Sequence, residues 1–310
     1  MPDRVLVIKL GAMGDVVQAL GPFAAIRAHH PGAHITLLTT PPFVAFAHAC
    51  GSFDDVWADD RPRAGEIGKW RALRGRLRGG GFSRVYDLQT SDRSNFYFRL
   101  FWPGPWPEWS GIARGCSHPH DNPDRDALHT VDRQAEQLRG AGIADVPPPD
   151  LAWADADVSR FGLAGPYVLL VPGGAAHRPA KRWPADRYAA LAAGLADQGI
   201  GSVVLGGEDE RPLANEIAAA SPKTLDLVGQ TDLFEIVALA RRAFGVVGND
   251  TGPVHLIAAA GCPSVVLYSS DSDPALCAQR GPRVSILRRP ALAELAVDEV
   301  QTALDQLASA

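Results

Sequence analysis

The segment 248–255, Gly-Asn-Asp-Thr-Gly-Pro-Val-His, combines polar side chains with the backbone setting of an anion site. It follows a buried-strand pattern at 244–247 and opens a helix pattern at 254–260. The first N–H groups of such a helix have no partner within it and its dipole is positive there, so backbone alone could hold a phosphate or a ribose. The candidate residues are Asp250, Thr251, Gly252 and His255. An ordinary helix start is the alternative, with Asp250 or Thr251 as the N-cap, Gly252 in a tight turn and His255 half-buried.

Strand and helix patterns that could position these residues alternate along the chain. The near-continuous apolar run 4–10 is typical of a parallel strand covered on both faces, and a helix pattern follows at 16–29. Further strands are expected at 34–39, 55–57, 84–89, 202–205, 225–228 and 264–268, and another begins at residue 167 in the run YVLLVPGG. Helices are expected at 66–78, 130–140, 185–198, 211–220, 233–241 and 292–307. This alternation predicts two α/β domains, each a doubly wound parallel sheet of the Rossmann-like type, facing each other across a cleft.

A proline run at 147–149 and an apolar-poor segment up to residue 160 indicate a linker between the two sets. We therefore expect an N-terminal domain at 1–155 and a C-terminal domain at 156–290. The last helix, within 291–310, is expected to pack on a domain face.

Composition narrows the class of protein. Hydrophobic residues at 46% and charged residues at 21% describe an ordinary globular chain. Residues 1–150 hold 17 basic and 17 acidic residues and residues 151–310 hold 13 and 18, so neither half is basic enough to suggest nucleic acid as a partner. The absence of a long apolar run and of a signal-peptide pattern predicts a cytoplasmic location. Four separated cysteines without a CxxC pair argue against disulfides and a structural zinc site.

Several stretches, in this order along the chain, resemble the ADP-heptose:lipopolysaccharide heptosyltransferases, which are family nine glycosyltransferases with a GT-B fold. They are RVLVIKLGAMGDVVQALGPFAAIRAHHPGAHITLL, VYDLQTSDRS, HTVDRQAEQLRGAGI, VPGGAAHRPAKRWP, LGGEDE and GNDTGPVHLIAAAGCPSVVLY. The resemblance implies an inverting transferase that uses no cofactor and no metal. It also implies a nucleotide-sugar donor, ADP-heptose, and a lipid-linked oligosaccharide acceptor, with peripheral contact at the inner face of the inner membrane.

The resemblance also implies roles for individual residues. Asp15, which on spacing alone would be an N-cap carboxylate, resembles the base that takes the proton from the acceptor hydroxyl. Gly11 and Gly14 would let the loop turn tightly and let a bulky sugar approach the backbone, and Gly14 belongs with the donor-binding residues. Lys181, otherwise an ordinary solvated lysine, resembles the lysine that contacts phosphate. Arg178 and Arg182 flank it and are expected to share that role, with one of them facing solvent, and His177 stands where much of the family has Ser or Thr.

On the same resemblance, the donor pocket extends further along the second domain. Glu208, after a strand end, would hydrogen-bond the ribose, and the turn around Thr231 would border the adenine. Asp250, Thr251, Gly252 and His255 would touch the diphosphate and the heptose. The segment 269–274, Ser-Ser-Asp-Ser-Asp-Pro, departs from the family's Gly-Pro-Thr type, which leaves the donor sugar open.

Two features of the sequence could bind the acceptor: a glutamine at a strand end and a helix face with three arginines. Gln89 ends the strand 84–89, and the helix spacing of Arg71, Arg74 and Arg78 places three arginines along one face. A phosphorylated lipid at an anionic membrane would select such a face, and a solvated helix surface is the alternative. The aromatic-rich segment 96–109 is expected in the core, and an interfacial anchor or a sugar-stacking surface is the alternative.

Three other readings stay open on the sequence. One is a GT-B transferase with a different nucleotide sugar or acceptor, because the fold does not determine the substrate. Another is a protein that binds a nucleotide or glycan without catalysis. The last is a nucleotide-sugar epimerase with two similar domains, which would convert its donor without an acceptor.

Overall fold

The computed structural model describes residues 3–174 and 179–309. The chain forms two compact units, residues 1–150 and 151–310. The division falls between Asp150 and Leu151, a few residues before the boundary expected after residue 155. Among the described residues, no helix is both long enough and apolar enough to cross a membrane.

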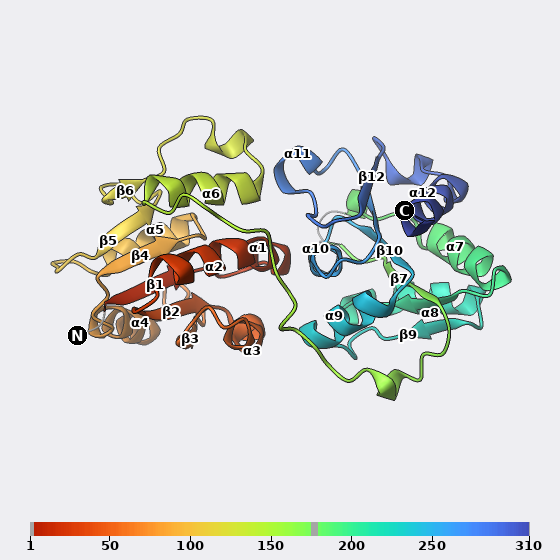
Figure 1. The fold of residues 1–310 in the computed structure, drawn as a ribbon, viewed down its shortest axis with the longest axis horizontal. Helices are drawn as coiled ribbons and strands as arrows, with labels where there is room; N and C mark the ends of the chain where they lie inside the picture. Colours follow the sequence, from red (N-terminus) through yellow and green to blue (C-terminus); the bar gives the residue numbers. More distant parts are fainter. Residues whose placement is uncertain (1–2, 175–178, 310) are drawn as a thin grey trace. The chain divides into compact units, whose positions relative to one another are not determined.

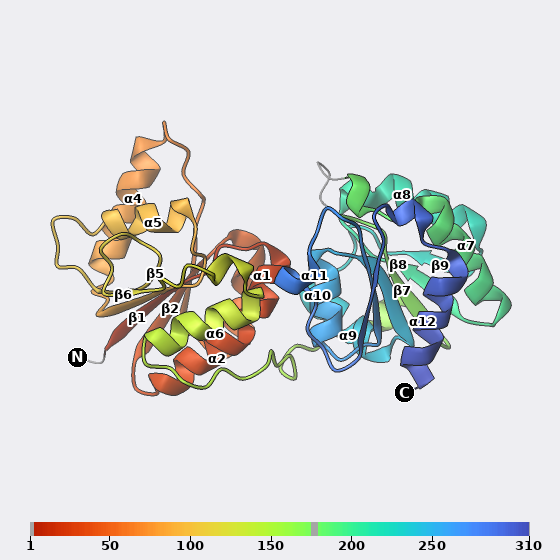
Figure 2. The same cartoon turned by 90° about the horizontal axis from the view of Figure 1, so that it is seen from above.

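The first unit is built on a parallel sheet with the strand order β3-β2-β1-β4-β5-β6 (Figure 1). Its strands are β1 (Arg4–Ile8), β2 (His34–Thr39), β3 (Asp55–Ala58), β4 (Arg84–Asp87), β5 (Glu108–Gly111) and β6 (His118–Pro119). Its helices are α1 (Met13–Gln18), α2 (Leu20–His29), α3 (Val44–Ala49), α4 (Ile67–Gly79), α5 (Asp92–Arg99) and α6 (Thr130–Gly140). Figure 2 shows α4 and α5 on one face of the sheet and α2 and α6 on the other, which is the doubly wound arrangement.

The helix predicted at 16–29 is two helices that meet at Ala19, so the prediction of one continuous helix is wrong. Pro22 lies in the first turn of α2. Proline has no N–H for the helix ladder, and its ring clashes with the carbonyl four residues earlier, here that of Gln18. α1, which contains Asp15, therefore ends at Gln18, and α2 begins as a separate helix at Leu20.

Local patterns did not reveal every element. The aromatic segment 96–109 includes the end of α5 and the start of β5, and β6 follows in a Pro-, Gly- and His-rich stretch. The aromatic side chains of the segment 96–109 lie in two environments. Tyr97, Phe98, Phe101 and Trp109 are buried, whereas Phe96, Trp102 and Trp106 are exposed. The edge strand β12 (Val284–Arg288) is only half-buried, so its sequence lacks the apolar run of a central strand.

The second unit repeats the plan of the first, with the parallel strand order β12-β11-β10-β7-β8-β9. Its other strands are β7 (Tyr167–Val171), β8 (Gly201–Val204), β9 (Thr224–Asp226), β10 (Gly245–Asn249) and β11 (Ser264–Tyr268). Its helices are α7 (Ala185–Asp197), α8 (Arg211–Ala220), α9 (Leu233–Arg242), α10 (Gly252–Ala259), α11 (Pro274–Cys277) and α12 (Val297–Ser309). The buried side chains of β7 and β11 and those of α7 and α12 form one core.

The C-terminal helix belongs to the second unit and contacts α7 as well as β10 and β11. The predicted helix at 292–307 is a 3-10 turn at Leu292–Glu294 followed by α12. Gly245 at the start of β10 lets α12 approach, because a Cβ there would lie 2.5 Å from Leu304 Cδ1.

In chain order, both sheets run 3-2-1-4-5-6, and the winding direction reverses between β1 and β4 and between β7 and β10. Open α/β sheets bind ligands outside the carboxyl ends of the strands at this reversal. The topology therefore selects the segments after β1, β4, β7 and β10 as candidate sites.

Candidate functional site

The reversal in the second unit brings together two of the predicted donor-site residues. Lys181 ends a 3-10 turn after β7, and Asp250 follows β10 directly. Lys181 Nζ lies 2.8 Å from Asp250 Oδ2, and the two side chains are only 12% and 9% exposed. Lys181 is therefore held in one position by a buried ion pair and is not the solvated lysine of the alternative reading.

Three further side chains hydrogen-bond the Asp250 carboxylate. Tyr268 Oη donates to Oδ1 at 3.1 Å, Gln279 Nε2 donates to the same oxygen at 3.3 Å, and Ser272 Oγ donates to Oδ2. Burial raises the pKa of Asp250, but the hydrogen bonds from Lys181 and Ser272 and the charge of Lys181 hold that pKa below its ordinary value. The carboxylate thus stays ionised and fixes the ammonium beside it.

The start of α10 lies next to this pair. Thr251 is in the N-cap position, but its side chain makes no capping hydrogen bond, and the Asp250 carboxylate binds other groups. In the first turn, Pro253 has no N–H and Val254 N donates to the Thr251 carbonyl at 3.2 Å, so Gly252 supplies the N–H that can face an anion. His255 is 7% exposed, and its charge contributes to the lowered pKa of Asp250. The Gly252 N–H, the helix dipole and the Lys181 ammonium together form a setting for an anion.

Asn249, the last residue of β10, holds the neighbouring backbone in place. Its Oδ1 accepts from Trp183 N at 3.1 Å, and its Nδ2 donates to the carbonyls of Pro172 and Gly173 at 2.8 and 3.0 Å. These bonds fix both ends of the loop between β7 and α7. Two predicted donor residues in that loop, His177 and Arg178, lie outside the described residues.

Arg182 and Glu210 connect the loops after β7 and β8. Arg182 Nη2 donates to the Gly174 carbonyl at 2.6 Å and lies 3.6 Å from Glu210 Oε1. Glu210 also contacts Gly173, where a Cβ would stand 2.8 Å from its Cγ. Arg182, expected beside Lys181 as a possible phosphate contact, is instead bonded to the Gly174 carbonyl and Glu210, which gives it a local structural role.

Glu208 and Thr231 follow β8 and β9 at the same edge of the sheet. Glu208 is paired with Arg211 at 2.8 Å but is 71% exposed, so its carboxylate remains open to solvent. It lies against Gly229, whose φ is +70°, and a Cβ there would be 2.0 Å from Glu208 Oε1. The structure thus brings Glu208 to the turn that contains Thr231, which is half-buried.

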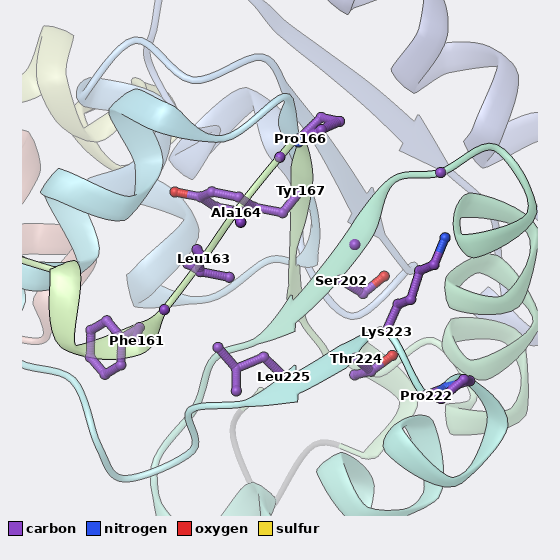
Figure 3. A pocket seen from close by; sticks show the side chains of 14 residues that line it. Phe161, Leu163, Ala164, Pro166, Tyr167, Ser202, Pro222, Lys223, Thr224 and Leu225 are labelled. Atoms are coloured by element: carbon purple, nitrogen blue, oxygen red, sulfur yellow. The ribbon is translucent and has the colours of Figure 1, made fainter.

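A separate cavity of about 470 Å³ opens at the amino ends of β7, β8 and β9. Figure 3 shows it between the segment 161–166 and the strand residues Ser202 and Thr224. Lys181, Glu208 and Asp250 all follow the carboxyl ends of their strands, at the other edge of the sheet. This cavity is therefore not the predicted donor site.

In the first unit, Asp15 is the third residue of α1, and its Oδ2 accepts from Ala12 N at 2.9 Å. The N-cap of α1 is Ala12, so Asp15 is not the N-cap carboxylate that spacing alone suggested; it binds the N-cap N–H from the third helical position and also lines a cavity of about 190 Å³. Gln89 lines the same cavity, and its Oε1 accepts from Leu10 N at 2.8 Å. The tight turn occurs at Gly11, with φ +113°, whereas Gly14 lies within α1. The structure therefore assigns the turn to Gly11 alone.

The three predicted arginines of α4 have different surroundings. Arg78 donates to the carbonyls of Phe101 and Gly104, each at 2.8 Å, and Arg74 donates to the Trp102 carbonyl at 2.7 Å. Arg71 is exposed. Arg71 and Arg74 border a cavity of about 610 Å³, which we call the α4–α5 groove. Its other lining side chains include Ile67, Trp70, Arg93, Phe96 and Leu100.

Several residues of these sites were not predicted to take part in them. Tyr268, Ser272 and Gln279 come from segments beyond β10 and reach Asp250 only in the folded unit. Lys9 and Arg133 line the cavity beside Asp15. A lysine inside an otherwise apolar strand was the available signal for Lys9.

In the described ranges 3–174 and 179–309, no group of three or more His, Cys, Asp and Glu side chains could hold a metal ion. The buried His120 is not part of such a group; its Nε2 lies 3.4 Å from Glu136 Oε1.

Comparisons with known proteins identify relatives of this chain by sequence and by fold. A profile of glycosyltransferase family 9 (heptosyltransferase) matches residues 70–303. Lipopolysaccharide heptosyltransferase 2 of Escherichia coli strain K12 is 29% identical over 296 residues, covering 87% of this chain and 83% of that protein.

Two solved structures share the fold. The structure of E. coli ADP-heptose LPS heptosyltransferase II aligns with a TM-score of 0.81 at 24% identity, covering 99% of this chain and 98% of that one. The structure of E. coli heptosyltransferase WaaC with ADP-2-deoxy-2-fluoro heptose aligns with a TM-score of 0.77 at 23% identity, covering 98% and 99%. The predicted fold class, two Rossmann-like parallel sheets of the GT-B type, is confirmed.

Proposed function

Because the chain belongs to glycosyltransferase family 9 (heptosyltransferase), we propose that this glycosyltransferase moves heptose from ADP-heptose to a sugar of the lipopolysaccharide inner core. The names of its relatives support both substrates: one is a lipopolysaccharide heptosyltransferase and another was solved with an ADP-heptose analogue. The reaction is a single displacement that inverts the anomeric carbon. The acceptor oxygen forms the new bond, the bond to ADP breaks, and the proton passes from the acceptor hydroxyl to Asp15.

Asp15 is suited to the role of general base. Its Oδ2 is oriented by the Ala12 N–H, and the residue borders a cavity at the carboxyl ends of β1 and β4. A carboxylate fixed by the backbone next to a cavity can receive the hydroxyl proton without searching for its orientation.

Lys181 and the first turn of α10 stabilise the departing diphosphate. The observation that carries the proposal is that the Lys181 ammonium is held 2.8 Å from Asp250, beside a helix start without a side-chain cap. Negative charge grows on the leaving group in the transition state, and positive groups fixed in advance stabilise it there. Glu208 and the turn at Thr231 extend this site toward the ribose and the base.

Donor selection tests the proposal. In calorimetric titrations we expect ADP to bind at least about tenfold more tightly than UDP or GDP, since base contacts would discriminate by a kcal/mol or more. With ADP-heptose and purified lipopolysaccharide that lacks outer core and heptose, ADP should be released together with heptose transfer. A preference for UDP or GDP, or no transfer with ADP-heptose, would contradict the proposed donor.

An incubation of the enzyme with donor alone separates the remaining alternatives. A transferase leaves ADP-heptose essentially unchanged without an acceptor, whereas an epimerase would change its stereochemistry. A protein that only binds would show nucleotide affinity and no turnover in either reaction.

We also propose that the face of α4 and α5 contacts an anionic membrane, where a lipid-linked acceptor would be located. Four of the five exposed large hydrophobic side chains among the described residues lie here: Ile67, Phe96, Trp102 and Trp106. The fifth, Ile286, is in the second unit. Helix α4 itself carries one lysine, four arginines and no acidic residue. Apolar and cationic side chains on one face are the combination that binds an anionic bilayer surface.

Vesicle binding tests this surface. The double variant Trp102→Ser/Trp106→Ser should bind phosphatidylglycerol-containing vesicles about tenfold more weakly than the original chain in a sedimentation assay, because two aromatic anchors are lost. The Trp102 carbonyl that accepts from Arg74 and Arg78 is backbone and is retained. The matched control is Ile286→Ser, which removes the exposed apolar side chain of the other unit. Equal binding of all three proteins would refute the assignment.

A further inference from the structure

The Asp250 carboxylate has a hydrogen-bond donor at each of its lone pairs. Lys181 Nζ and Ser272 Oγ lie 2.8 and 2.5 Å from Oδ2, and Tyr268 Oη and Gln279 Nε2 lie 3.1 and 3.3 Å from Oδ1. A carboxylate has about four lone-pair sites, so these four donors fill them. All five residues belong to the second unit. The set of bonds to Asp250 is complete only while the Tyr268 hydroxyl donates to it.

The Lys181 ammonium has donors left for a ligand. An ammonium carries three N–H groups, and Asp250 is the one acceptor of Lys181 Nζ among residues 3–174 and 179–309. A diphosphate that takes the other N–H groups competes with the carboxylate for the same positive charge. As the ammonium moves toward such a ligand, the negative charge of Asp250 loses compensation in a place where its side chain is 9% exposed. A buried charge without its partner is costly, so this movement needs a substitute donor.

The Tyr268 hydroxyl lies near more acceptors than it can serve. It has one hydrogen, but Oη lies 3.1 Å from Asp250 Oδ1, 2.9 Å from Gln279 Oε1 and 3.5 Å from the Cys277 carbonyl. The side chain is completely buried. Burial and the charge of Asp250 raise the pKa of Tyr268 above its ordinary value, so the hydroxyl keeps its hydrogen. It therefore donates either to the Asp250 carboxylate or to the Gln279 amide.

The Gln279 amide makes the two choices interchangeable. Its Nε2 donates to Asp250 while its Oε1 faces the Tyr268 hydroxyl. The reverse orientation of the amide would place Oε1 at 3.3 Å from Asp250 Oδ1, where two acceptors repel, so the ionised carboxylate selects the first orientation. Both acceptors of the Tyr268 hydroxyl then lie within hydrogen-bond distance at once. Rotation of the O–H bond alone moves the hydrogen from Gln279 to Asp250, with no heavy atom displaced.

We propose that Tyr268 is a positioning residue that acts on the Lys181 ammonium through Asp250. Its hydroxyl donates to Gln279 while Lys181 neutralises the carboxylate, and it turns to Asp250 when the ammonium moves onto a bound diphosphate. The rotation supplies a donor to the carboxylate as its positive partner withdraws, which lowers the cost of sharing Lys181 with the ligand. Tyr268 is fully buried and does not itself contact the ligand. This inference rests on the proposed function in taking Lys181 as the group that binds the diphosphate.

Tyr268→Phe tests the coupling, because it keeps the buried ring and removes only the hydroxyl. Calorimetric titrations with ADP and with inorganic pyrophosphate compare the original chain, Tyr268→Phe, Lys181→Met and the double variant. With Lys181 present, we expect Tyr268→Phe to weaken the binding of both ligands about tenfold, as loss of a hydrogen bond to a charged group would do. In the Lys181→Met background the same substitution should change neither affinity, because no ammonium is left to share.

The matched control is Tyr167→Phe. It removes another buried tyrosine hydroxyl of the same unit, which donates to the Leu239 carbonyl at 2.8 Å, and it should change neither affinity in either background. An equal loss of affinity on Tyr268→Phe with and without Lys181 would show that the hydroxyl only supports the shape of the site, and it would overturn the inference. Unchanged affinity of Tyr268→Phe for both ligands would overturn it as well.

Thermal unfolding without ligand separates this inference from the proposed function. Tyr268→Phe should lower the Tm more in the Lys181→Met background than in the original chain, because a carboxylate without its cation depends more on the remaining donors. Equal falls in Tm would overturn the inference even if ADP-heptose proves to be the donor. Conversely, a preference for UDP or GDP would contradict the proposed donor, whereas the pyrophosphate titrations and the Tm comparison would still report the coupling between Tyr268 and Lys181.

Discussion

Replacing Asp15 with asparagine is expected to lower kcat for heptose transfer by roughly 10²- to 10⁴-fold, the range typical for loss of a general base. The substitution keeps an oxygen that can accept the Ala12 N–H, so the start of α1 is preserved. An amide cannot take up the acceptor proton at neutral pH, so the chemical step alone is impaired. Single-turnover measurements with ADP-heptose and acceptor report that step directly.

Nucleotide affinity provides the internal check on Asp15. ADP should bind Asp15→Asn as it binds the original enzyme, because the proposed nucleotide contacts all lie in the second unit. The matched control is Asp298→Asn, an exposed aspartate in the first turn of α12, for which kcat should be unchanged. An Asp15→Asn enzyme that retains full turnover would remove Asp15 from the role of base.

Replacing Lys181 with methionine is expected to weaken ADP binding by about 10- to 100-fold, as loss of a charged hydrogen bond to the diphosphate would do. The rate of transfer should fall by about 10²-fold or more, because the same ammonium stabilises the leaving group. Calorimetry with ADP and steady-state kinetics measure the two effects. Lys223→Met, which removes an exposed lysine near the amino edge of the same sheet, should change neither.

The ion pair with Asp250 offers a way to separate ligand binding from folding. Lys181→Met leaves a buried carboxylate without its cation and should lower the free energy of unfolding by about 3 kcal/mol. The double variant Lys181→Met/Asp250→Asn removes both charges and should recover most of that loss. It should not recover ADP affinity. If ADP affinity returns together with stability, Lys181 acts only by neutralising Asp250.

Much of the fold could be predicted from short stretches of sequence. Strands β2 and β11 and helices α6 and α8 have the predicted bounds, and β7 begins at the predicted residue, because apolar runs and helix periodicity are local properties. The prediction failed where neighbours decide the outcome. Strand β12 lies at a half-exposed edge, and α5 is an aromatic helix whose side chains divide between the core and the surface.

The sequence also indicated the segments of the proposed donor site, but it did not predict their contacts. The resemblance pointed to Lys181 and to the start of α10, and both follow strands that meet at the sheet reversal. That Asp250 is bonded to Lys181, Tyr268, Ser272 and Gln279 follows from three-dimensional packing. The assignment of the α4 arginines to one common face was similarly incomplete, because Arg78 binds backbone carbonyls near Trp102.

The sequence by itself determined the alternation of strands and helices, the two-sheet class and the position of each chemically capable residue at a strand end. These depend on residue type and spacing over about ten positions, which local backbone preference and burial pattern encode. Only the tertiary structure decided which of these residues meet. Lys181 and Asp250 are 69 positions apart, and they come together because the strand order places β7 beside β10. Residues of the first unit's site meet in the same way, because β1 lies beside β4. That order is a property of the packed sheets, so no local pattern specifies it.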